Sequence, residues 1–221
     1  MPDPATPTAP ASAARAPSDA YRHAEKFVNW VYDQCEDPGR RAALRSGLGH
    51  PLDKCRRMHA VIAHRVPRQY GEPTERAYYA IAAMVASLPP AARRSTAAGK
   101  PAQADTARNL GRCLADSQVR QTTAEARLSL LSRQSLAGLH RHLPPTVRML
   151  ADRPGAVDFA QLLLDLIRWD KRRDQVARSW LQTYYRAAFE AERKAAQEAD
   201  EGEAPSAPAH DADSGTAEPA N

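Results

Sequence analysis

Apolar residues recur along this chain with the period of an α-helix, and this pattern limits the possible folds more than any other feature. The clearest stripe follows a 3.6-residue repeat, and its members are Phe159, Leu162, Leu163, Leu166 and Ile167. Similar stripes occur within residues 27–35, 52–62, 78–88 and 176–184. No stretch alternates apolar and polar residues as a half-buried strand does, and there is no Asn-Gly or Asp-Gly hairpin turn. The sequence therefore predicts an all-α protein, a single compact bundle of about eight or nine helices.

Several helix ends can also be predicted from local chemistry. Asp158 is placed to cap the helix that carries the clearest stripe. Thr122 and Glu125 have the spacing of a capping box, which predicts that another helix begins there. The pair Pro144-Pro145 predicts the end of one helix and the start of a new helical turn.

The two ends of the chain differ in composition from its centre. Residues 1–19 contain five prolines and show no apolar period, and residues 196–221 contain seven acidic residues and no basic ones. Neither segment can bury enough apolar surface to offset the entropy lost on ordering. We therefore predict disordered tails at 1–19 and 196–221 around a helical domain at 20–195. Residues 89–104 are predicted to form the longest internal loop.

Positive charge is concentrated in the middle of the chain. Between Arg40 and Arg148 there are 19 basic and 6 acidic residues, whereas the rest of the chain has 12 basic and 20 acidic residues. Seventeen of the 19 basic residues are arginines, whose planar guanidinium matches the geometry of phosphate. This basic block indicates an anionic polymer as the partner, and nucleic acid is the first candidate.

No set of residues in the sequence has the spacing of a known catalytic site. The Gly-rich phosphate loops, the Gly-x-Ser-x-Gly nucleophile motif and the His-Glu-x-x-His metal motif are all missing from the sequence. Asp165 and Asp170 stand beside basic residues, and we interpret them as solvated ion-pair partners. The sequence therefore predicts a protein that is not an enzyme, with no cofactor and no small-molecule substrate.

The cysteines indicate neither a metal site nor a set of disulfide bonds. Cys55 and His59 lie four residues apart on an apolar helical stripe, and we interpret both as core residues rather than metal ligands. The three cysteines are odd in number and form no Cys-x-x-Cys pair. The sequence also shows no signal peptide and no apolar run of membrane-spanning length, so we expect a soluble, cytoplasmic protein.

Some arginines in the block have an informative local context. Arg41 and Arg45 lie four residues apart in a short segment after Pro38-Gly39, so they project from one helix face. Arg112 follows Gly111, a glycine that permits the close approach of another backbone. Arg127 and Arg133 flank a stripe formed by Leu128 and Leu131.

An ordered series of segments resembles the CasB family, the small subunit of the type I-E CRISPR Cascade complex. Residues 37–45, Asp-Pro-Gly-Arg-Arg-Ala-Ala-Leu-Arg, resemble the family's D-x-G-x-x-A-x-L-R-R signature, and residues 109–115 resemble its S-L-G-R-x-L-A segment. Residues 125–133 resemble its next basic helix, and residues 157–185 resemble its C-terminal helices. The resemblance covers about Phe27 to Arg186.

The resemblance implies an all-helical, non-catalytic subunit that is present as two copies in a ribonucleoprotein. Its partners would be the crRNA, the target and non-target DNA strands, the other Cascade subunits and a second copy of itself. In this family the subunit lies beside the guide–target duplex and helps hold the displaced strand. We expect the nucleic-acid-binding residues to be Arg41, Arg45, Arg76, Lys100, Arg112, Arg127, Arg133, Arg141 and Arg148.

The chain departs from the family pattern at two places. Ser46 stands where the signature has its second arginine, and Pro144-Pro145 replaces a pair of arginines. We expect Arg141 and Arg148 to compensate for the second change.

Two alternatives remain open from the sequence. One is a free-standing helical DNA-binding regulator that reads bases through a helix-turn-helix, for which residues 40–45 are the available segment. The other is a helical scaffold whose arginines face acidic proteins.

Overall fold

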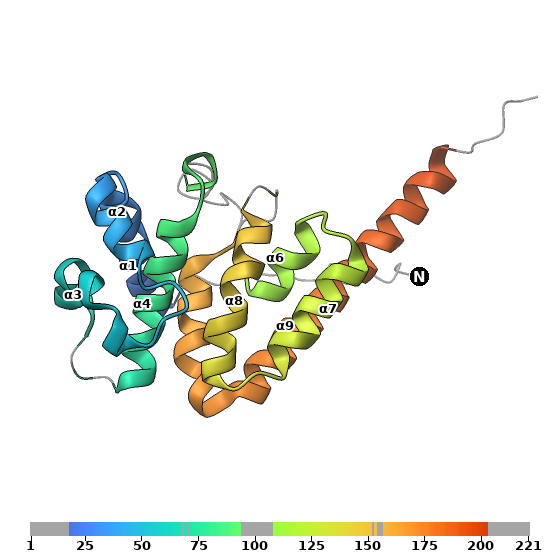
Figure 1. Ribbon diagram of the computed structural model, residues 1–221. Coiled ribbons are helices and arrows are strands. Elements are labelled where there is room, and N and C mark those ends of the chain that lie inside the picture. Colours follow the sequence, from blue (N-terminus) through green and yellow to red (C-terminus); the bar gives the residue numbers. More distant parts are fainter. Residues whose placement is uncertain are drawn as a thin grey trace, which may run out of the picture. The chain divides into compact units, whose positions relative to one another are not determined.

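The computed structural model describes residues 18–67, 69, 71–93, 108–151, 153 and 157–202, and every regular element in these ranges is a helix (Figure 1). The prediction of an all-α protein is confirmed. The α-helices are α1 (Asp19–Gln34), α2 (Pro38–Arg45), α3 (Arg56–Ile62), α4 (Glu72–Ser87), α6 (Leu110–Asp116), α7 (Gln121–Ser132), α8 (Leu136–Leu150) and α9 (Phe159–Gly202). Two 3₁₀ turns, Leu52–Lys54 and Ala63–Arg65, flank α3. None of the described helices is long and apolar enough to cross a membrane.

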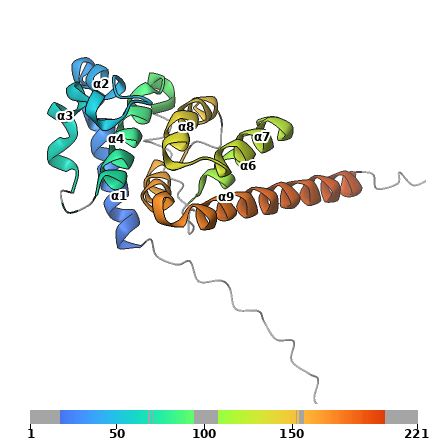
Figure 2. The ribbon, with the colours of Figure 1, turned by 60° about the horizontal axis from the view of Figure 1, so that its bottom comes forward.

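The contacts divide the chain into one unit up to Ala187 and a second unit from Ala188. In the first unit α2 packs against α3 and α4, and α4 packs against α1 and α8 (Figures 1 and 2). Helix α7 packs against α6 and α8. The apolar stripes of these helices meet in one core.

Helix α9 is interrupted at Arg172, where φ is −137° and ψ is 33°. This break allows its first segment to fold back against the second, as Figure 1 shows in orange. The rings of Trp169 and Trp180, one from each side of the break, lie 5.1 Å apart and are fully buried. The break therefore positions the two largest side chains of the core.

The helix continues to Gly202, past the predicted boundary of the helical domain at residue 195. Residues 188–202 are rich in Ala and Glu, which favour helix even without packing. Lys194 and Glu198 add an ion pair one turn apart, 3.6 Å long. The described helix therefore includes residues 196–202 of the tail predicted at 196–221. Residues 1–17 and 203–221 of the predicted tails lie outside the described residues.

Helix α8 corrects the prediction that Pro144-Pro145 ends a helix. The helix runs without interruption from Leu136 to Leu150 with both prolines inside it. Leu143 before the pair and Val147 after it are both buried, so the core holds both halves of the helix in line. Tertiary packing here outweighs the cost of proline in a helix interior.

The predicted helix caps have mixed outcomes. The Asp158 carboxylate accepts a hydrogen bond from the Gln161 amide at 2.9 Å, so the predicted cap of α9 is confirmed. The capping box at Thr122 is wrong: α7 begins at Gln121 with Arg120 as N-cap, and no side chain caps it. Glu125 instead accepts a hydrogen bond from the Gln121 side chain.

Gly111 confirms the predicted close approach of two backbones. A Cβ atom on this residue would overlap the backbone carbonyl of Trp180, so α6 and α9 are in contact at this point. The neighbouring Asn109 side chain caps α6 through the Arg112 amide and also donates to Thr183 in α9 at 3.0 Å.

Candidate nucleic-acid interface

The described residues among those expected to bind nucleic acid differ in how far their side chains are exposed to solvent. Lys100 lies outside the described residues. The exposed members are Arg45, Arg112, Arg133, Arg141 and Arg148, and the half-buried ones are Arg41, Arg76 and Arg127.

Two helices carry pairs of these arginines on one face. Arg41 and Arg45 lie one turn apart on α2, as the sequence indicated. Arg141 and Arg148 lie seven residues apart on α8, which places them on one side of that helix. Leu139 and Leu143 lie on the opposite side and are fully buried. The two arginines of α8 therefore share its solvent-facing side.

Helix α7 and its ends carry three further arginines. Arg127 is half-buried in the helix, and Arg133 is its exposed C-cap. Arg120, the exposed N-cap, lies seven residues before Arg127 and was missing from the predicted set. Arg120 belongs to the same basic block, which is a signal for the region as a whole. No local motif distinguished it from the other basic residues.

These arginines lie on a row of helices that pack one against the next. The row runs from α2 to α4, from α4 to α8, from α8 to α7, and from α7 to α6 (Figures 1 and 2). The segments around residues 41 and 141, which are far apart in the sequence, therefore lie on two helices, α2 and α8, that both pack against α4.

Within the described ranges, most of the predicted arginines have no acidic partner. Arg112 pairs with Asp116 at 3.0 Å, and Arg108 pairs with the same carboxylate at 2.7 Å. Among the described residues, no salt bridge is formed by the other members of the set, which are Arg41, Arg45, Arg76, Arg127, Arg133, Arg141 and Arg148. These seven cations are therefore not neutralised within the described part of the chain, and the exposed ones among them can bind phosphate without breaking an internal pair.

Asp165 corrects the prediction of two solvated aspartates. It is 5% exposed and accepts hydrogen bonds from Trp180 Nε1 at 2.6 Å and from Gln161 Nε2 at 2.7 Å. Burial raises the pKa of its carboxyl group to about 6, against the lowering effect of these two donors. Asp170 is exposed. Asp165 therefore belongs to the packing between the two segments of α9.

The interpretation of Cys55 and His59 as core residues is right for Cys55 and wrong for His59. Cys55 is buried, but His59 is exposed, and its Nδ1 lies 2.6 Å from the Tyr79 hydroxyl. Within the ranges that the structure describes, no three His, Cys, Asp or Glu side chains are grouped as a metal site would require. All three cysteines are free and buried, and burial raises the pKa of each thiol.

The sequence and the fold match a known protein family. Residues 40–185 match the family model for CRISPR-associated protein Cse2. A chain of a CRISPR RNA-guided surveillance complex is 36% identical, with a TM-score of 0.68, over 80% of this chain and 99% of that one. A chain of such a complex in a pre-nicking state is also 36% identical, with a TM-score of 0.69, over 79% of this chain and 98% of that one.

More distant structures share the fold. CasB from M. ruber is 21% identical, with a TM-score of 0.61, over 77% of this chain and 97% of that one. CasB from Thermus thermophilus is 23% identical, with a TM-score of 0.56, over 73% of this chain and 97% of that one. No curated protein matches the sequence.

Proposed function

The chain belongs to the CRISPR-associated protein Cse2 family, and from this premise we propose that it is the small subunit of a Cascade-type surveillance complex. In that role it binds the phosphate backbone of nucleic acid and stabilises the loop formed when guide RNA pairs with target DNA. It acts in the cytoplasm, as two copies beside the other subunits, and performs no chemistry itself.

The observation that carries this proposal is the set of arginines without acidic partners. Arg41 and Arg45 on α2, Arg127 and Arg133 on α7, and the α8 pair all lie on packed neighbouring helices. A guanidinium that has no internal carboxylate keeps its hydrogen-bond donors for an external anion. Phosphate is the anion that repeats along a nucleic acid, so several such cations can bind one strand together.

The mechanism needs no base-specific contact. Base pairing between guide and target reads the sequence, whereas the protein contacts shape and backbone. Opening the DNA duplex is nearly balanced in free energy by formation of the RNA–DNA duplex. Backbone contacts to the displaced strand therefore shift the equilibrium towards the open loop. Stacking of a base on Trp30 is not needed either. The partly exposed ring of Trp30 is already covered by Arg65, whose guanidinium lies 5.1 Å from the ring centroid.

Alanine variants of the α7 arginines test the proposal in the assembled complex. Arg127→Ala and Arg133→Ala are expected to weaken retention of the displaced strand. For each lost contact to a single strand, the slope of log K against log salt should fall by roughly 0.7. Arg22→Ala is the matched control, because Arg22 is exposed, lies outside the basic block and pairs with Asp19.

An unchanged slope in both variants would remove Arg127 and Arg133 from the contact surface. The free-standing regulator predicts a different result: the isolated protein would then prefer one duplex sequence over others of equal length.

A further inference from the structure

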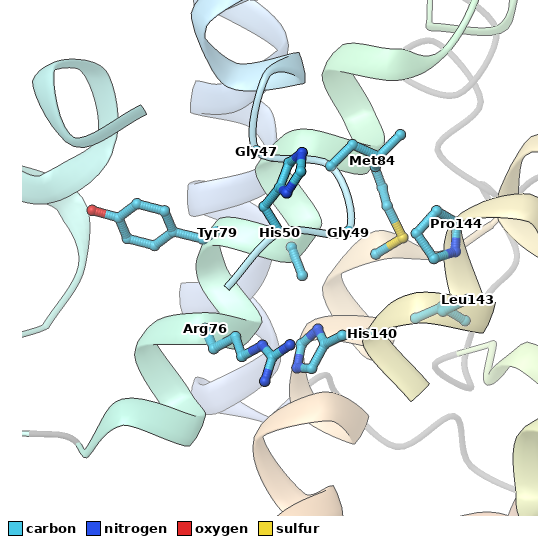
Figure 3. A pocket seen from close by; sticks show the side chains of 11 residues that line it. Gly47, Gly49, His50, Arg76, Tyr79, Met84, His140, Leu143 and Pro144 are labelled. Carbon is cyan, nitrogen blue, oxygen red and sulfur yellow. The ribbon is translucent and has the colours of Figure 1, made fainter. Parts of the chain in front are cut away.

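A small recess lies where α4, α8 and the turn after α2 meet (Figure 3). The turn Gly47–His50 forms one wall, Arg76 and Tyr79 come from α4, and His140 and Pro144 come from α8. Its interior volume, measured for the centre of a water molecule, is about 10 Å³. A recess of this size holds about one water molecule.

Two nitrogen atoms at this recess are buried and have no hydrogen-bond partner among the described residues: Arg76 Nε and His140 Nε2. His140 as a whole is 5% exposed. Figure 3 shows the guanidinium of Arg76 and the ring of His140 next to each other. Leaving both nitrogens dry would cost the desolvation free energy of each.

The two groups differ in charge. Burial, and after it the nearby charge of Arg76, lower the pKa of His140 to about 4, so the imidazole is neutral at neutral pH. A neutral imidazole offers one nitrogen as an acceptor, whereas Arg76 Nε–H only donates. Water fits between such a pair because it can accept a hydrogen bond from Arg76 Nε–H and donate one to the acceptor nitrogen of the imidazole.

Pro144 removes one helical hydrogen bond at the same turn of α8. Proline has no N–H, so it cannot donate to the carbonyl of His140, four residues earlier. The unpartnered side-chain nitrogens of Arg76 and His140 therefore lie beside a turn of α8 that has one hydrogen bond fewer than a regular helix.

We propose that this recess binds one water molecule, which accepts a hydrogen bond from Arg76 Nε and donates one to His140 Nε2. The bridge links α4 to α8. Arg76 then serves the packing of these two helices and does not belong to the phosphate-binding surface. The enclosed space of the recess, about 10 Å³, matches a single water. The water site does not depend on the function proposed above.

A high-resolution crystal structure of the full chain, grown without phosphate or sulfate, tests the site directly. We expect an ordered water within hydrogen-bond distance of both Arg76 Nε and His140 Nε2. A direct Arg76–His140 hydrogen bond, a dry recess or an anion in it would overturn the proposal.

A double-mutant cycle gives a second readout in solution. Arg76→Leu and His140→Leu each leave the other nitrogen buried without its bridge, so each should lower the melting temperature. The double variant should lose clearly less than the sum of the two single losses, because it leaves neither nitrogen unpaired. Additive losses would contradict a shared water.

Nucleic-acid binding separates the bridging role from a phosphate contact. In the assembled complex, Arg76→Leu should leave the salt slope of strand retention unchanged, whereas Arg141→Leu, an exposed position on α8, should lower it. If Arg76→Leu lowers the slope as Arg141→Leu does, Arg76 contacts phosphate and the assignment is wrong. If neither variant lowers the slope, the failure concerns the proposed function and the crystallographic test of the water stands.

Discussion

Gly111 sets how closely α6 approaches α9. Replacing it with alanine places a methyl group against the carbonyl of Trp180, with the new Cβ 2.8 Å from the carbonyl carbon. Because backbone atoms cannot move aside as a side chain does, the helices must separate. We expect Gly111→Ala to lower the free energy of unfolding by about 1–3 kcal/mol, measured by chemical denaturation.

Gly138→Ala in α8 is the matched control for this variant. There the added methyl group meets mainly the flexible end of the Gln134 side chain, which can rotate away. Alanine also favours helix over glycine by up to about 1 kcal/mol, so this variant should be neutral or more stable. Equal stability of the two variants would show that α6 and α9 do not require the close approach.

Asp165 makes stability depend on pH with a defined sign. Its folded-state pKa of about 6 is higher than the ordinary value of 3.8, so the folded protein binds this proton more tightly than the unfolded chain. Protonation therefore favours folding, and the contribution of Asp165 to stability increases as pH falls through 6 towards 4. Over the whole window the change is of the order of 3 kcal/mol.

Asp165→Asn isolates this contribution, because asparagine stays neutral and its carbonyl can still accept from Trp180. Between pH 5 and pH 8, the melting temperature of the unmodified protein should fall relative to that of Asp165→Asn. Asp170→Asn, at an exposed position on the same helix, controls for the loss of a negative charge alone. A pH-independent difference between the unmodified protein and Asp165→Asn would contradict the raised pKa.

At the level of elements, α8 shows how the core overrides a local signal. Pro145 is exposed, so its ring contributes little packing, yet it removes the N–H that would bond to the Arg141 carbonyl. Pro145→Ala should therefore stabilise the protein by roughly 2 kcal/mol, the helical cost of proline less the entropy it removes from the unfolded chain.

Denaturation and hydrogen exchange together check this prediction. The amide introduced at position 145 should exchange slowly, as a hydrogen-bonded helical amide does. No gain in stability together with rapid exchange would mean that the Arg141 carbonyl does not accept from this amide.

The helices were largely predictable from the sequence, because burial on one side of a helix forces apolar residues into its period. The stripe at Phe159–Ile167 and the Asp158 cap are examples. The continuity of α8 was not predictable, since it depends on buried contacts on both sides of Pro144-Pro145. The early start of α7 was also missed, because no side chain caps it at Arg120.

The site was predictable only as a region. The basic block indicated an anionic partner, and the order of the segments indicated the family. Pairing could not be predicted in the same way: Arg108 reaches Asp116 from the connection before α6, a contact that only the fold creates. The burial of Asp165 likewise depends on Trp180, which the break at Arg172 brings back towards it.

Across the molecule as a whole, most of the predicted arginines lie on helices where the described residues place no carboxylate within ion-pair distance of them. The basic block at residues 40–148 spans neighbouring helices and contains 6 acidic residues against 19 basic ones. Arg141 and Arg148 occupy the solvent-facing side of α8, next to Pro144-Pro145, where the family resemblance led us to expect a pair of arginines. We propose that this side takes over the lost contact.

Crosslinking between protein and nucleic acid within the assembled complex tests the central claim most directly. Photocrosslinked peptides would be identified by mass spectrometry with target DNA bound and the loop open. We expect crosslinks from α7 and α8, on peptides that carry Arg127, Arg133, Arg141 or Arg148. Crosslinks from these helices to other protein subunits alone, with none to DNA or RNA, would contradict it and would favour a scaffold that binds only protein.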